Sequence, residues 1–248
     1  MKRLTYIIFA LILVLPLDVQ AQQVNASSSE DVALLFYKTG SAIPNFTSWI
    51  EETPEYHHTP WAKREKKMRA EKNKLALRYQ NTSPENDLIK IKVPVELSLQ
   101  IIEENTEKPI HVLSLKFVGA NNIDYFPYKF MEQNIAVIPT NLKLFKNNKI
   151  SKKKFIAIKP LAEKARNNIF SAIIELQAQN VDITQPYNLD GIDQWIFRTR
   201  IAIFSVFDSK NNVIWERMEP WYTSPITENL NNLYDGQYKE EPEYISSQ

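Results

Sequence analysis

The chain has 248 residues and no cysteine, with 30 cationic and 29 acidic side chains, which gives a formal net charge of +1. Without cysteine it has no disulfide bonds, no thiolate metal ligands and no thiol nucleophile, so packing alone must hold the fold. The near-neutral charge does not favour a global attraction to nucleic acid, and we do not expect nucleic acid as a partner.

Residues 1–21 have the pattern of a secretory signal peptide. Lys2 and Arg3 precede an apolar run at residues 6–15, and small side chains end the segment at Ala21. Ten residues of helix rise only about 15 Å, half the thickness of a hydrocarbon core, so the run is too short to span a bilayer. The sequence therefore predicts an exported protein, periplasmic or secreted, with no transmembrane segment after signal cleavage.

The rest of the chain divides by composition and hydrophobic period. We expect a polar linker at residues 22–30, a single α+β domain at residues 31–222, and an acidic, loosely ordered tail at residues 223–248. Within the domain, residues 31–82 have a helical pattern and residues 88–222 are β-rich. This order predicts N-terminal helices packed on a mainly antiparallel β-sheet or on a small sandwich.

Three helices are expected before residue 82. Ser28 and Asp31 are spaced as a capping box, and the helix that follows them should end at Gly40. Thr47 is the expected N-cap of a short second helix. Thr59 is the expected N-cap of the third, with a proline in its first turn.

The third helix, residues 60–80, carries eight cations and two carboxylates. On a helical wheel, four apolar side chains form one narrow stripe: Trp61, Met68, Leu75 and Tyr79. The cations fill the remaining arc, where Glu65 and Arg69 have i, i+4 spacing for an ion pair. We interpret this segment as a helix that packs on the protein body with its charges in water. The alternatives are a polyanion-binding helix, or a structural subunit that docks its stripe on another chain.

From residue 88 the hydrophobic period changes to two, as in strands. Strands are predicted at residues 88–100, 110–117, 124–130, 134–139, 153–160, 170–179, 195–208 and 211–218. The first two and the last two should pair as hairpins. His111 shares a face with apolar neighbours in its strand, which favours a half-buried histidine over a catalytic base.

The densest group of polar side chains is a candidate metal site with Glu51, Glu55, His57 and His58 as ligands. Imidazole and carboxylate groups can bind Zn²⁺, but adjacent histidines diverge in a helix or a strand. No catalytic motif is present, and we expect no catalytic residue and no cofactor. A metal- or carboxylate-dependent hydrolase is the alternative.

A lysine run and nearby aromatic rings are the candidate binding residues: Lys143, Lys146, Lys152, Lys153, Lys154, Tyr125 and Tyr128. Residues 142–155 contain six lysines and no acid. Exposed rings stack on sugars or bases, and lysines beside them attract anions. The alternatives are a solvated loop for the lysines and core packing for the rings. The sequence favours a non-catalytic binding or accessory protein of the cell envelope, whose ligand is an envelope protein or an anionic lipid or glycan.

Five segments carry a resemblance over most of the mature chain: IPNFTSWIEETPEY, LRYQ at the end of a charged helix, VPVELS, FPYKF and AIKPLAEKAR. In this order they resemble an uncharacterised family of exported bacterial proteins, a domain of unknown function. The resemblance implies a bacterial envelope setting. It supplies neither an activity nor site residues.

Overall fold

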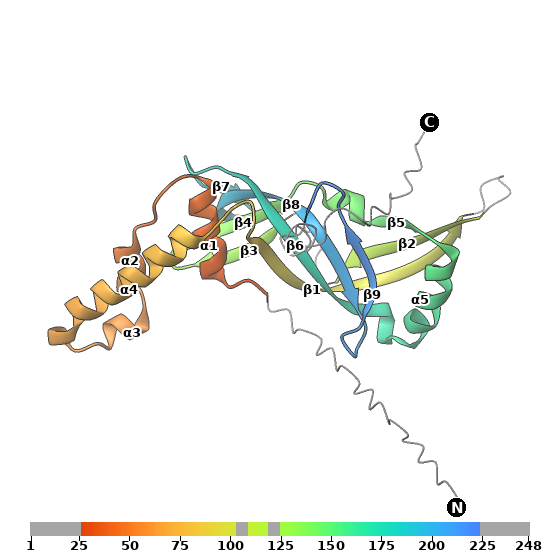
Figure 1. Ribbon diagram of the computed structural model, residues 1–248, viewed down its shortest axis with the longest axis horizontal. Coiled ribbons are helices and arrows are strands. Elements are labelled where there is room, and N and C mark those ends of the chain that lie inside the picture. The colour runs from red at the N-terminus through yellow and green to blue at the C-terminus, as the bar shows by residue number, and fades with distance from the viewer. Residues whose placement is uncertain (1–25, 103–108, 119–124, 224–248) are drawn as a thin grey trace, which may run out of the picture.

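The computed structural model describes residues 26–102, 109–118 and 125–223 (Figure 1). Within these residues the fold combines mostly N-terminal helices with a mixed sheet that curls into a half-barrel. None of the described helices is both long and apolar enough to cross a membrane. The predicted signal peptide and nearly all of the predicted acidic tail lie outside the described residues.

Four helices gather at one end of the molecule (Figure 1). They are α1 (Ser29–Thr39), α2 (Phe46–Glu51), α3 (Pro54–His57) and α4 (Trp61–Asn81). The predicted capping box of α1 is confirmed, because the Asp31 N–H donates to Ser28 Oγ at 3.2 Å and the Ser28 N–H donates to Asp31 Oδ2 at 3.1 Å. Phe36 of α1 packs on Phe197 of the sheet at 5.7 Å between ring centroids, so this helix covers the core.

Two predicted helix caps are wrong. The N-cap of α2 is Asn45, whose Oδ1 accepts from the Ser48 N–H at 3.2 Å, whereas Thr47 lies inside the helix. Helix α4 begins at Trp61 after Pro60, which has no side-chain cap. The Thr59 hydroxyl instead donates to the Glu55 carbonyl at 2.6 Å, so it completes the turn of α3 and is not available to α4.

The apolar stripe of α4 packs on its own chain from Met68 onward. Leu75 is buried, and Met68 and Tyr79 pack against the core. Trp61 is 85% exposed, which contradicts its predicted place in the buried stripe, because the first turn of α4 extends beyond the body of the protein (Figure 1). The predicted Glu65–Arg69 ion pair is present at 3.1 Å.

Over the described ranges the sheet contains nine strands: β1 (Leu88–Ile102), β2 (Ile110–Phe117), β3 (Phe126–Phe130), β4 (Gln133–Pro139), β5 (Asn147–Ile150), β6 (Ile169–Val181), β7 (Tyr187–Leu189), β8 (Ile192–Phe207) and β9 (Val213–Met218). Its hydrogen-bonded order is β3-β4-β8-β6-β1-β2-β5, and β7 and β9 pair with β8. Both predicted hairpins are confirmed. The sheet is mixed, because β4 and β8 run parallel while the other described pairs are antiparallel.

The predicted strand at residues 153–160 is wrong, because α5 (Lys152–Lys164) occupies this segment. Ser151 caps the helix by accepting the Lys154 N–H at 3.2 Å. Phe155 and Ile158 are buried at helical spacing, while Ile156, which strand alternation would pair with Ile158, is 60% exposed. The Phe155 ring meets the buried His111 ring edge-on at 4.9 Å, which fixes α5 against β2.

Aromatic contacts show how far the sheet curls. Phe117 of β2 lies 5.9 Å from Phe126 of β3 and 6.3 Å from Phe204 of β8, between ring centroids, although β2 and β3 are remote in the strand order. Phe145, in the short helix η1 (Leu142–Phe145) between β4 and β5, packs on Phe204 at 5.7 Å. The core therefore fills the concave side of the half-barrel.

Gly40, where α1 ends as predicted, is required for space and not for its backbone conformation. Its φ is −78°, and a Cβ there would lie 2.8 Å from Val181 Cγ2 and 2.9 Å from Ile183 Cγ2. We expect Gly40→Ala to lower the free energy of unfolding by about 1–3 kcal/mol, because two branched side chains must move. Urea denaturation measures the change. The triple variant Gly40→Ala, Val181→Ala and Ile183→Ala should lose less unfolding free energy than the sum of the losses in the three single variants. A loss equal to that sum would show that the alanine at position 40 does not clash with these two side chains.

Candidate functional site

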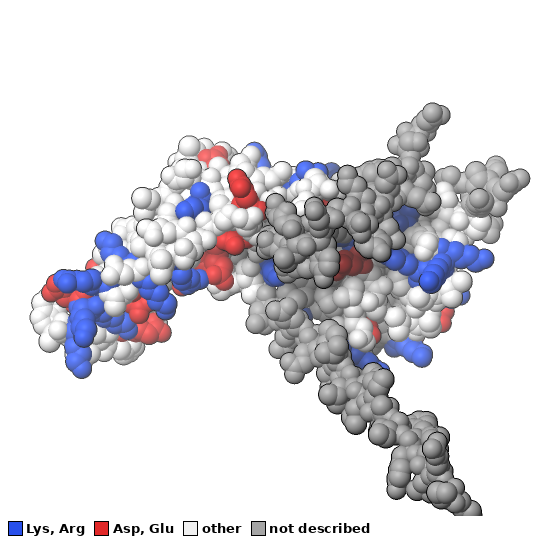
Figure 2. All heavy atoms as spheres, viewed as in Figure 1, with Lys and Arg blue, Asp and Glu red and all other residues white. Residues whose placement is uncertain are grey.

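Six lysines form an exposed basic surface, which we call the lysine surface: Lys143, Lys146, Lys149, Lys152, Lys153 and Lys154. They come from η1 and its C-cap Lys146, from β5 and from the first turn of α5. None of them forms an ion pair with a carboxylate of the described residues, whereas Arg69, Lys74 and Arg78 of α4 do. Figure 2 shows blue spheres gathered at the α5 end, with few red ones near them, and blue and red spheres mixed over the outer end of α4.

Buried side chains between the lysines hold this surface in place. Leu142 and Phe145 anchor η1 in the core, and Phe155 anchors α5. Asn148 is 4% exposed, and its amide donates to the Phe145 carbonyl at 2.7 Å. The lysines therefore project from ordered elements. The sequence could not distinguish this arrangement from a solvated loop.

The two predicted tyrosines do not join the lysine surface. Tyr125 precedes β3 and its hydroxyl donates to Asp190 Oδ2 at 3.0 Å. Tyr128 lies within β3, where burial raises the pKa of its phenol to about 12. Because β3 and β5 are the first and last strands of the sheet order, the tyrosines and lysines belong to opposite sheet edges.

The predicted metal ligands lie on α2, α3 and the turn after α3. Glu51, Glu55, His57 and His58 are exposed there, and His58 Nδ1 lies 2.6 Å from the Pro54 carbonyl oxygen. In the part of the chain that the structure describes, no group of three or more His, Cys, Asp or Glu side chains is arranged to hold a metal ion. The geometry thus gives no support to the metal-dependent alternative.

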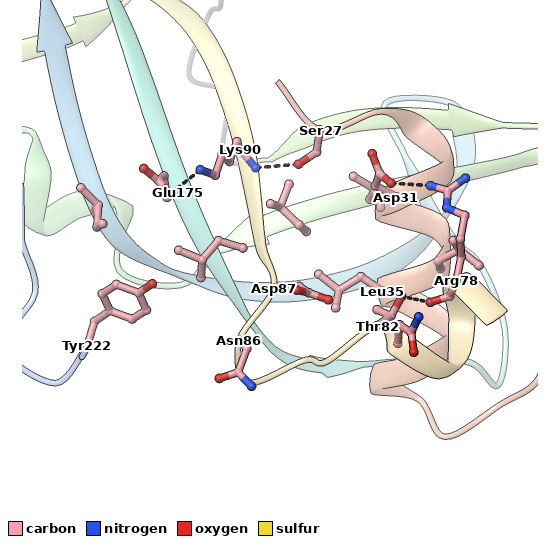
Figure 3. A pocket seen from close by; sticks show the side chains of 16 residues that line it. Ser27, Asp31, Leu35, Arg78, Thr82, Asn86, Asp87, Lys90, Glu175 and Tyr222 are labelled. Atoms are coloured by element: carbon pink, nitrogen blue, oxygen red, sulfur yellow. Dashed lines mark hydrogen bonds and ion pairs between the residues drawn. The ribbon is translucent and has the colours of Figure 1, made fainter. Parts of the chain in front are cut away.

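A groove of about 760 Å³ lies between α1, the start of β1 and β6 (Figure 3). Two cations line it, and both are already paired. Lys90 Nζ lies 3.3 Å from Glu175 Oε2, and Arg78 Nη2 lies 2.6 Å from Asp31 Oδ1. Tyr222 closes one side, and its pKa is raised by burial and by the nearby Glu175 carboxylate. Among the residues that the structure describes, this groove offers no free positive charge to an anionic ligand.

A second groove, of about 720 Å³, lies between β5 and β9, and we call it the seam. Residues 147–151, Lys154 and residues 215–218 line it. Arg217 of β9 crosses its floor, because Nη1 donates to the Leu144 carbonyl at 2.9 Å and to Asn148 Oδ1 at 3.1 Å. The lysine surface borders the seam on the β5 side, since Lys149 and Lys154 belong to both.

Sequence reasoning did not identify Arg217 or Asn148 as parts of this region. Asn148 belongs to a four-residue strand that contains only one apolar side chain, which is too short for a period to be visible. Arg217 lies in a correctly predicted strand, but its neighbours across the seam are about 70 residues earlier in the chain.

Comparison with known proteins gives no relative for this chain. No protein-family model, no curated protein and no solved structure matches it.

Proposed function

We propose that this protein is an exported, non-catalytic binding protein of the bacterial cell envelope that holds an anionic ligand on the lysine surface. The observation that carries the proposal is a group of six exposed lysines on ordered elements, with no ion-pair partner among the described carboxylates. The envelope setting is motivated by the N-terminal sequence pattern and by the resemblance to exported proteins.

Like charges gathered without counter-charges repel one another, so an anion that approaches them gains attraction from several at once. The three lysines at the start of α5 also lie at a helix N-terminus, where the helix dipole adds to their positive potential. On α4 the positive potential is reduced at Arg69, Lys74 and Arg78, because carboxylates of α4 and α1 pair with these three cations.

The triple variant Lys152→Glu, Lys153→Glu and Lys154→Glu tests the proposal. A lysine near an anionic surface contributes about 1 kcal/mol, so we expect binding to phosphatidylglycerol vesicles, to a sulfated glycan or to polyglutamate to weaken by about a hundredfold or more. Binding isotherms at low and moderate salt measure the effect, which should shrink as salt increases.

A triple reversal on α4, Lys63→Glu, Lys66→Glu and Lys72→Glu, is the matched control. These lysines are also exposed, and the change in net charge is identical. If the proposal is right, the α4 variant keeps most of the affinity. Equal losses in both variants would show that only net charge matters, and the proposal would fail. Wild-type protein that binds none of the three probes would also overturn it.

A further inference from the structure

We infer that the seam binds one extended acidic peptide segment of a partner protein, which inserts between β5 and β9 as an additional strand. This inference rests on the proposed function, because the same lysines supply the attraction, and it names the chemical class of the ligand. Three features of the seam carry it: two free backbone edges, a groove between them that no backbone hydrogen bond of the described residues closes, and an excess of positive charge.

The first feature is that both strands present unused backbone groups. Among the described residues β5 pairs only with β2, and β9 pairs only with β8. The Glu219 N–H donates to the Ala202 carbonyl, so by alternation the backbone groups of Arg217 also face β8, and those of Glu216 and Met218 face the seam.

The same reasoning applies to the opposite edge. The Leu115 N–H donates to the Lys146 carbonyl, so Asn148 and Ile150 face β2, and the backbone groups of Asn147 and Lys149 point into the seam. Edge groups of this kind are templates for an added strand.

The second feature is the separation of the edges. In the described residues no backbone hydrogen bond joins β5 to β9, yet the Arg217 side chain alone reaches from one to the other. A strand inserted between two edges would lie about 4.8 Å from each, and the seam between these two edges has a volume of about 720 Å³. Arg217 would then lie beneath the inserted strand as part of the floor.

The third feature is charge. Glu216 accepts a hydrogen bond from the Ser205 hydroxyl at 2.7 Å, and Arg217 is paired with Glu219 at 2.9 Å. Lys149 and Lys154 remain without a described carboxylate partner, and the rest of the lysine surface adjoins them. An inserted strand directs alternate side chains to the outer side, where the lysines project, so acidic residues at every second position complement the site.

The probe is a fluorescein-labelled peptide of alternating Glu and Thr, with six residues to match the six residues of β9. Fluorescence anisotropy with the full mature chain measures its affinity. The matched control is the same peptide with N-methyl groups on alternate amides, which keeps every side chain and charge but blocks hydrogen bonds to one edge. We expect N-methylation to weaken binding by at least about tenfold.

Met218→Pro tests the protein side of the same contact. Proline at position 218 removes an N–H that faces the seam and leaves the hydrogen bonds to β8 intact. Edge strands tolerate proline where the lost N–H faces away from the neighbouring strand. We expect this variant to lose affinity for the Glu-Thr peptide by about tenfold while its affinity for polyglutamate, an irregular polyanion, is unchanged. Lys149→Gln with Lys154→Gln should weaken binding of both ligands.

The outcomes separate this inference from the proposed function. Equal affinities for the peptide and its N-methylated form, with a loss in the lysine variants, would leave anion binding in place and overturn strand insertion. An effect of N-methylation without any effect of the lysine variants would overturn the acidic specificity. A synthetic peptide of residues 224–248 that displaces the probe at similar concentration would identify the chain's own C-terminal segment as the occupant, against a partner protein.

Discussion

Asn141→Ala should lower the free energy of unfolding by about 3 kcal/mol or more, although Asn141 belongs to no strand. The Ile201 N–H donates to Asn141 Oδ1 at 2.7 Å, and the Asn141 amide donates to the Ile201 carbonyl at 3.1 Å. The side chain thus extends the β4–β8 ladder by one step where the main chain turns into η1. Its removal orphans two buried backbone groups, each of which costs about 1–3 kcal/mol.

Asn134→Ala is the control for this experiment. Asn134 lies in the same strand pair, and its amide donates at 3.3 Å to the Asp193 carbonyl at an exposed position. We expect a change within about 0.5 kcal/mol, because water replaces the lost partner. Urea denaturation of both variants measures the difference. Equal losses would show that the Asn141 amide does not hold β8.

Local patterns in the sequence were sufficient for most single elements. Alternation along residues 170–179 predicts Phe170, Ile174 and Leu176 on one face, and all three are buried in β6. The capping box before α1 and both hairpins are also local features, and they are correct. The strand predicted at residues 153–160 failed because FIAI has four apolar residues in succession, which fit a buried strand as well as one face of a helix.

The pairing of distant elements was not predictable in this way. The parallel contact of β4 with β8 joins segments about 60 residues apart, and nothing in NIAVIP specifies the direction of its partner. The position of the lysines in the fold could not be predicted for the same reason. Their charge was evident in the sequence, but their separation from Tyr125 and Tyr128 depends on the strand order, and their position beside β9 depends on the curl of the sheet.

Arg217→Met should also destabilise the protein by about 3 kcal/mol. Glu219 has a side chain only 6% exposed, and its Oε1 accepts from Arg217 Nε at 3.0 Å and Nη2 at 2.9 Å. Removal of the guanidinium leaves a buried carboxylate without its cation, which is costly in a low-dielectric interior. The contacts of Arg217 with Leu144 and Asn148 across the seam are lost as well.

The double variant Arg217→Met with Glu219→Gln separates these two causes. If the unpaired carboxylate dominates, neutralising it should restore more than half of the lost stability, as measured by urea denaturation. If the bridge across the seam dominates, the double variant should be as unstable as the single one. Lys159→Met, which breaks the exposed Lys159–Glu163 pair at 4.0 Å, should change stability by about 0.5 kcal/mol or less. A comparable loss there would mean that burial does not set the strength of the Arg217–Glu219 pair.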